Sequence, residues 1–98
     1  MRFTILELRK VFDNMTAKRM ISALNQQRNL VVGTRTVRVP FTHRFGAVST
    51  MLQTLNVFDL DRAIEAYEER LVSENHRHVY KRTLRMLEKF HKLQQELS

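Results

Sequence analysis

The chain has 98 residues, contains no cysteine and carries a formal net charge of +7. A chain of this length predicts one small domain, and the lack of cysteine excludes a disulfide framework and a thiolate metal site. No apolar run approaches the length of a membrane span and no secretory signal is present, so we expect an intracellular protein, either cytoplasmic or, if it binds DNA, in the nucleoid or nucleus.

Basic residues without acids fill the middle of the sequence. Residues 14–58 hold six arginines and lysines and no aspartate or glutamate, whereas residues 59–98 hold eight basic and eight acidic residues. Such a long acid-free window is unexpected when acids make up roughly 12% of an ordinary protein. The middle of the chain is therefore where we expect an anionic partner to bind.

The first elements are predicted to be two helices. Thr4 and Glu7 have the spacing of a capping box, and apolar residues follow at helical spacing, which predicts a helix over about 4–13. Thr16 is the expected N-cap of a second helix that runs to about Arg28.

A β-hairpin is predicted at about residues 30–40. Short apolar runs flank Gly33-Thr34, which would form the turn, and Pro40 ends the second strand. Thr42 would then cap a third helix extending to about Leu55.

The last part of the chain shows helical periodicity, and the phase of the apolar residues shifts near residues 73–76. Residues 59–97 are therefore expected to form either one bent helix or two. The apolar residues make a stripe like that of a coiled coil. The second stripe is broad for so short a chain and favours a homodimer. Intramolecular packing against the first and third helices is an equal alternative. The predicted dimerisation residues are Val79, Met86, Phe90, Leu93 and Leu97.

These elements predict a mainly α fold of four to five helices with one short hairpin. The whole chain, 1–98, would be a single domain. Residues 1–56 would form its basic part and residues 57–98 its helical association part.

The second helix and the hairpin carry the predicted nucleic-acid contacts. The apolar side of the helix is expected to be buried through Ala17, Met20, Ile21 and Leu24. Its opposite face then presents Lys18, Arg19, Ser22, Asn25 and Gln26, all of which can hydrogen-bond bases. The residues predicted to contact phosphates are Arg28, Arg35, Arg38 and Arg44. The helix–hairpin order is similar to the second half of a winged helix, although only one short helix precedes it here. The alternative is a solvated helix face beside a basic strand edge.

A second basic stretch follows near the C-terminus. Arg77, Lys81, Arg85, Lys89 and Lys92 line one flank of a helix, and Arg82 lies beside them. They would extend the phosphate contacts or pair with the acidic segment 59–74, and the short distance in sequence favours the pairing.

Metal binding and catalysis are not predicted. His76 and His78 would point apart on a helix, and the Glu88–His91 pair lacks the further carboxylates that a di-metal site requires. There is no glycine-rich phosphate loop and no buried pair of carboxylates, so we expect neither an enzyme nor a cofactor.

The sequence therefore favours a small dimeric DNA-binding protein, a transcription regulator or an accessory factor. One alternative is an adaptor or inhibitor module that docks its basic surface on an acidic partner protein. Binding of RNA through the same arginines is another. A membrane-surface role is not expected.

Overall fold

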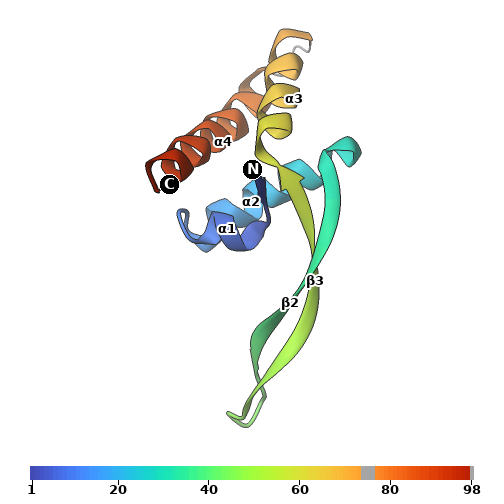
Figure 1. The fold of residues 1–98 in the computed structure, drawn as a ribbon, viewed down its shortest axis with the longest axis vertical. Coiled ribbons are helices and arrows are strands. Elements are labelled where there is room, and N and C mark those ends of the chain that lie inside the picture. The colour runs from blue at the N-terminus through green and yellow to red at the C-terminus, as the bar shows by residue number, and fades with distance from the viewer. Residues whose placement is uncertain (74–76, 98) are drawn as a thin grey trace.

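In the computed structural model the described residues are 1–73 and 77–97, without the side chains of Arg28, residues 72–73 and 77–79, and Leu97. The elements within them follow the chain in the order shown in Figure 1: β1 (Arg2–Phe3), α1 (Ile5–Arg9), α2 (Asn14–Asn25), the 3-10 helix η1 (Arg28–Leu30), β2 (Val31–Thr42), β3 (Val48–Asp59), α3 (Leu60–Ser73) and α4 (Arg77–Leu97).

This arrangement is an α+β fold, and the prediction of a mainly α fold with one short hairpin is wrong. The three strands form an antiparallel sheet in the order β1-β3-β2. β2 and β3 are 12 residues long each, so strand content is far larger than the hairpin predicted at 30–40.

No third helix forms at Thr42 to Leu55. This segment contains the last residue of β2, the turn and the first eight residues of β3. Val48, Met51 and Leu55 do have helical spacing, but each lies opposite a residue of β2 in the sheet. The segment is also rich in β-branched residues, which fit a pleated strand well. Pairing with β2 therefore decides its structure, and that pairing is not visible in the spacing alone.

The turn of the hairpin lies at residues 43–47 rather than at Gly33-Thr34. Gly33 lies inside β2, where the register shifts by a bulge between Val31 and Gly33. The true turn contains Gly46 with a φ of 87°, a conformation that glycine adopts without strain. The amide of Gly46 donates to the His43 carbonyl at 2.9 Å, and the amide of His43 donates to the Ala47 carbonyl at 2.7 Å.

The two N-terminal helices form where expected, with shifted ends. Thr4 caps α1 in a complete capping box with Glu7, but α1 ends at Arg9 rather than near residue 13. The N-cap of α2 is Asp13 and not Thr16. Asp13 Oδ1 accepts from the Thr16 amide at 2.7 Å, and Asp13 Oδ2 accepts from the Thr16 hydroxyl at 3.0 Å.

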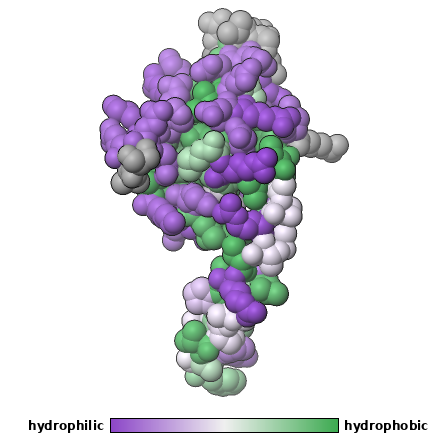
Figure 2. Space-filling view, in the orientation of Figure 1, coloured by the Kyte–Doolittle hydropathy of each residue, from purple (hydrophilic) through white to green (hydrophobic). Residues whose placement is uncertain are grey.

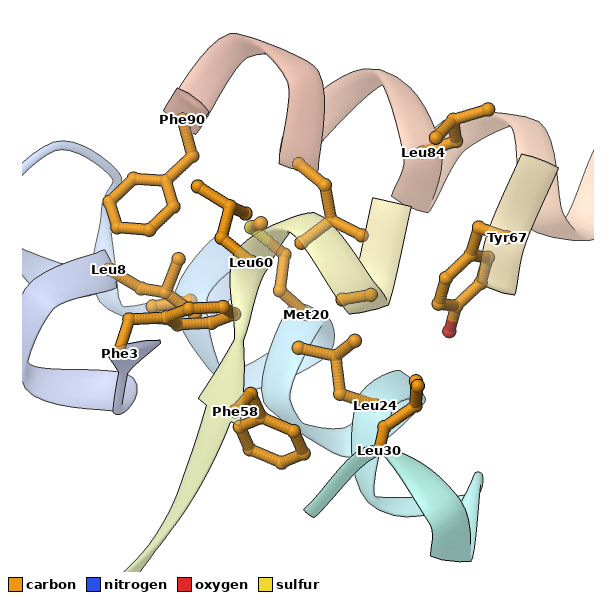
Figure 3. Close-up of a cluster of buried hydrophobic side chains, with 13 residues drawn as sticks. Phe3, Leu8, Met20, Leu24, Leu30, Phe58, Leu60, Tyr67, Leu84 and Phe90 are labelled. Carbon is orange, nitrogen blue, oxygen red and sulfur yellow. The ribbon is translucent and has the colours of Figure 1, made fainter. Parts of the chain in front are cut away.

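A single core joins the two ends of the chain. Figure 3 shows Phe3, Leu24, Phe58 and Phe90 converging from β1, α2, β3 and α4. The ring centroids of Phe3 and Phe90 are 5.3 Å apart with a T-shaped geometry, and those of Phe3 and Phe58 are 5.8 Å apart. The C-terminal helices therefore complete the core of the N-terminal part.

Residues 60–97 form two helices, and α4 returns alongside α3 (Figure 1). Their connection, where the sequence predicted a phase shift near Ser73, includes residues 74–76, which lie outside the described residues. Among the helices described, none combines the length and apolarity that crossing a membrane requires.

Most of the β2–β3 hairpin projects from the body of the protein (Figure 1). We call residues 36–54 the arm. β1 pairs only with Phe58 and Asp59, so the sheet is three-stranded only at its base. The principal extents of the molecule are 51 × 29 × 23 Å, and the arm accounts for the long axis. Figure 2 shows hydrophobic patches along the arm, whereas the visible face of the body is mostly hydrophilic.

Candidate nucleic-acid interface

The buried and exposed faces of α2 follow from its apolar spacing. Ala17, Met20 and Leu24 are buried in the core. Because α2 has 3.6 residues per turn, the opposite face presents a different set of side chains to solvent. That exposed set is Asn14, Met15, Lys18, Arg19, Ser22, Asn25 and Gln26.

Two cations on this face are free to bind an anion. Lys18 and Arg19 have no ion pair with any side chain that the structure describes, and α2 itself contains no acid. The nearest acid in the sequence is Asp13, the N-cap of α2. Hydrogen bonds from the Thr16 amide and hydroxyl lower the pKa of Asp13 and keep it ionised. The face therefore offers positive charge one turn beyond a single capping carboxylate.

Asn25 has a structural partner that the sequence did not indicate. Asn56 Nδ2 donates a hydrogen bond of 2.9 Å to Asn25 Oδ1, which ties the end of α2 to β3. A cleft lies at this junction and is lined in part by Arg9, Ile21 and Gln53. Asn25 thus belongs to the join between α2 and the sheet, and its amide oxygen is already engaged.

A second crevice separates α2 from α4 and brings two arginines to one place. It is lined by Thr16, Arg19, Met20, Arg82, Thr83 and Met86. No carboxylate lines this crevice, and neither Arg19 nor Arg82 forms an ion pair among the described residues. Two arginines that line one crevice, with no counter-ion among the described residues, favour an anion between them. The Thr83 hydroxyl is a further hydrogen-bond donor in the same crevice, whereas the Thr16 hydroxyl already donates to Asp13 Oδ2 at 3.0 Å.

The predicted phosphate-binding arginines fall into three groups. Arg35 is engaged, because its Nη1 lies 2.7 Å from Glu7 Oε1. Arg38, on the arm, and Arg44, in its loop, are exposed and have no ion pair with a described residue. The side chain of Arg28 lies outside the described ones.

Glu7 is held ionised by this arrangement. Partial burial alone would raise its pKa, but hydrogen bonds from the Thr4 side chain and backbone and from Arg35 outweigh it, and the pKa is lowered. Arg35 therefore faces a carboxylate at neutral pH, which reduces its attraction for phosphate.

The basic stretch of α4 does not pair with α3 among the described residues. Lys81, Arg82, Arg85, Lys89 and Lys92 are all exposed. Among the described side chains, His91 Nε2 of α4 lies 3.7 Å from Asp61 Oδ1 of α3. These five side chains thus form no ion pair with the described acids of α3, and Glu74 of the predicted acidic segment lies outside the described residues. The side chain of Arg77 lies outside the described ones.

The predicted dimerisation residues are divided by the fold. Phe90 is fully buried in the core of its own chain and presents no surface to a partner. Met86 lines the crevice between α2 and α4, and Leu93 is partly buried. The side chains of Val79 and Leu97 lie outside the described ones.

Sequence reasoning missed Arg82 as a neighbour of Arg19 and Asn56 as the partner of Asn25. Neither has a local signal, because each pair is distant in sequence and is brought together only by packing. Among the described residues, no group of three or more histidines and acids could hold a metal ion. Comparison of the chain with protein-family models, curated proteins and solved structures gives no match.

Proposed function

We propose that this protein binds duplex nucleic acid, preferentially DNA, as a small regulator or accessory factor. The observation that carries the proposal is the exposed face of α2, whose Lys18 and Arg19 have no counter-ion among the described residues. It is supported by Arg82, which shares a crevice with Arg19, and by Arg38 and Arg44 on the arm.

The dimensions of α2 suit the major groove. A helix of 12 residues is about 18 Å long. The major groove of B-DNA, about 12 Å wide, admits one α-helix. Lys18 and Ser22 lie one turn apart on the exposed face and would reach base edges, because both residue types can hydrogen-bond there. Arg19 and Arg82, at the side of the helix, would hold a backbone phosphate.

Binding should depend strongly on salt. Five cations at this surface lack a described counter-ion: Lys18, Arg19, Arg38, Arg44 and Arg82. If Arg19 and Arg82 share one phosphate and each of the other three neutralises its own, the slope of log K against log salt is about −3.6, since each neutralised phosphate contributes about −0.9.

The test is fluorescence anisotropy of a labelled random-sequence DNA duplex, titrated with protein across a salt series. Arg19→Ala should weaken binding and make the slope less steep by about one unit. The matched control is Arg62→Ala, which removes an equal charge from an exposed site on the acidic helix α3 and should change the slope little.

Three results would contradict the proposal. One is no binding of duplex DNA at low salt, and another is an equal effect of the two substitutions. The third is tighter binding of duplex RNA than of DNA at every salt concentration, which would move the assignment to RNA.

A further inference from the structure

The arm exposes most of the large hydrophobic side chains that this protein leaves in solvent. Only Met1 and Met15 among the described residues are comparable elsewhere. A two-stranded ribbon without a third strand or a helix against it is marginally stable in water. A concentration of exposed apolar side chains on such a ribbon indicates a surface that a partner covers. The exposed residues of the arm are Phe41, Phe45, Val48, Met51 and Leu52.

Phe45 is the extreme case, because 94% of its surface is exposed at the tip of the arm. The loop around it is held by two backbone hydrogen bonds between residues 43 and 47. His43 Nε2 and Ser49 Oγ are 2.9 Å apart, and the His43 ring lies edge-on to Phe41 with centroids 4.7 Å apart. An ordered loop thus presents an aromatic ring away from the body of the protein.

The charge of the arm decides which partner fits. Arg38 and Arg44 are exposed, and no acid occurs between residues 14 and 58. Two arms of identical chains would bring these positive charges together, which disfavours a second copy of the chain as the occupant. A partner that fits both the positive charge and the exposed apolar side chains must be anionic and must have apolar surfaces between its charges. Duplex DNA has this arrangement, because apolar base stacks lie between its phosphates.

The length of the arm matches the repeat of a duplex. The side chain of Asn56 is hydrogen-bonded to Asn25 of α2, so this point of β3 lies at the body of the protein. From Asn56, β3 extends to Val48, next to the loop at the tip of the arm. At about 3.3 Å per residue, β3 covers about 26 Å from Asn56 to Val48, and the loop with Phe45 lies beyond it. One turn of B-DNA is about 34 Å, so a tip at this distance falls within one turn of the groove that α2 would occupy.

We propose that Phe45 inserts between base pairs and bends the duplex, while Arg38 and Arg44 contact the flanking phosphates. Apolar side chains that enter a base step unstack it and kink the helix, and the bent duplex can then contact more of the protein. The inference rests on the proposed function, and it adds a change in DNA shape to simple binding.

The first experiment places a fluorophore at the tip. Because the chain contains no tryptophan, Phe45→Trp provides a single indole at the tip, and Glu68→Trp provides a matched indole at an exposed position of α3, outside the proposed contacts. Stacking on bases quenches tryptophan fluorescence. Saturating duplex DNA should quench the Phe45→Trp variant strongly and the Glu68→Trp variant little.

The second experiment measures the bend itself. A duplex labelled with a donor and an acceptor at its two ends reports end-to-end distance by energy transfer, at protein concentrations that saturate the duplex. The wild-type protein should shorten this distance. Phe45→Ala should restore the unbent value and weaken binding by about 5- to 100-fold, the range for loss of one stacked aromatic. Glu68→Ala, at the exposed position of α3, should still bend the duplex.

The outcomes separate the two proposals. Binding without bending, or equal quenching of the two tryptophan variants, would overturn the insertion of Phe45 and leave duplex binding intact. Absence of binding would overturn both. A blue shift of the Phe45→Trp variant with vesicles of anionic phospholipid, without quenching by duplex, would assign the tip to a lipid surface and overturn the proposal.

Discussion

Arg35 Nη1 lies 2.7 Å from Glu7 Oε1, and this contact joins the base of the β2–β3 hairpin to α1. The other carboxylate oxygen of Glu7 accepts the amide of Thr4 at 2.9 Å and the Thr4 hydroxyl. A single side chain therefore closes the N-terminal cap of α1 and neutralises one arginine of the acid-free segment.

The first prediction concerns stability and pH. Glu7→Gln keeps a capping side chain but loses the charge, so it should lower the free energy of unfolding by about 0.5–1 kcal/mol at pH 7, because the ion pair is partly exposed. The folded-state pKa of Glu7 is lowered from its ordinary value of 4.5. Its contribution is thus complete above about 4.5 and is lost as the pH falls through the lower folded-state value.

Urea unfolding at several pH values measures this effect. The difference in unfolding free energy between wild type and Glu7→Gln should disappear as the pH falls below 4.5. The control Glu88→Gln, on the exposed face of α4, should have the same unfolding free energy as wild type at pH 7. A gap that persists unchanged at pH 2 would show that the charge of Glu7 is not its source.

The second prediction separates the two arginines of β2. Arg38 has no ion pair with a described residue, and Arg35 is held by Glu7. Arg38→Ala should therefore weaken duplex binding more than Arg35→Ala, and only the former should reduce the steepness of the salt dependence by about 0.9. Anisotropy titrations of both variants at four salt concentrations would decide. A larger effect of Arg35→Ala would mean that Glu7 releases it on binding.

Local patterns predicted the parts of the fold that local interactions determine. Thr4 and Glu7 are close in sequence, and the capping box they form is present. The spacing of Ala17, Met20 and Leu24 likewise predicted the buried side of α2 and, with it, the exposure of Lys18 and Arg19. These features need no knowledge of the rest of the chain.

The arm was missed because its structure depends on pairing between segments. Residues 48–55 have helical spacing as well as β-branched residues, and only their register with β2 selects the strand. The proximity of Arg82 to Arg19 has the same origin, since α4 packs beside α2 only in the folded chain. Phe45 carried no sequence signal because exposure at a loop tip becomes visible only when the loop is placed.

The third prediction concerns α4 and the oligomeric state. Phe90 is buried against Phe3 and Phe12, with centroid distances of 5.3 and 6.3 Å. Phe90→Ala should cost about 3–5 kcal/mol of unfolding free energy, and the milder Phe90→Leu should leave a folded protein that is less stable. Sedimentation velocity should show the same oligomeric state for Phe90→Leu and wild type. A shift from dimer to monomer at unchanged stability would restore Phe90 as a dimer contact.

The fourth prediction tests whether α4 contributes to duplex binding. Arg82 and Arg19 line one crevice in which no carboxylate of the described residues lies, so a phosphate placed there would contact both. Arg82→Ala should then reduce the salt slope by about 0.9, and the double variant Arg19→Ala/Arg82→Ala should lose less than the sum of the two single effects, because both arginines share one phosphate.

The control for Arg82 is Lys92→Ala, which removes an equal charge from the exposed face of the same helix, away from the crevice. Additive losses would mean that Arg19 and Arg82 contact separate phosphates. An equal loss from Lys92→Ala would mean that α4 acts through its total charge alone. Coupling of Arg19 with Arg82, without an effect of Lys92, would identify the crevice between α2 and α4 as a specific phosphate contact, since total charge alone predicts neither result.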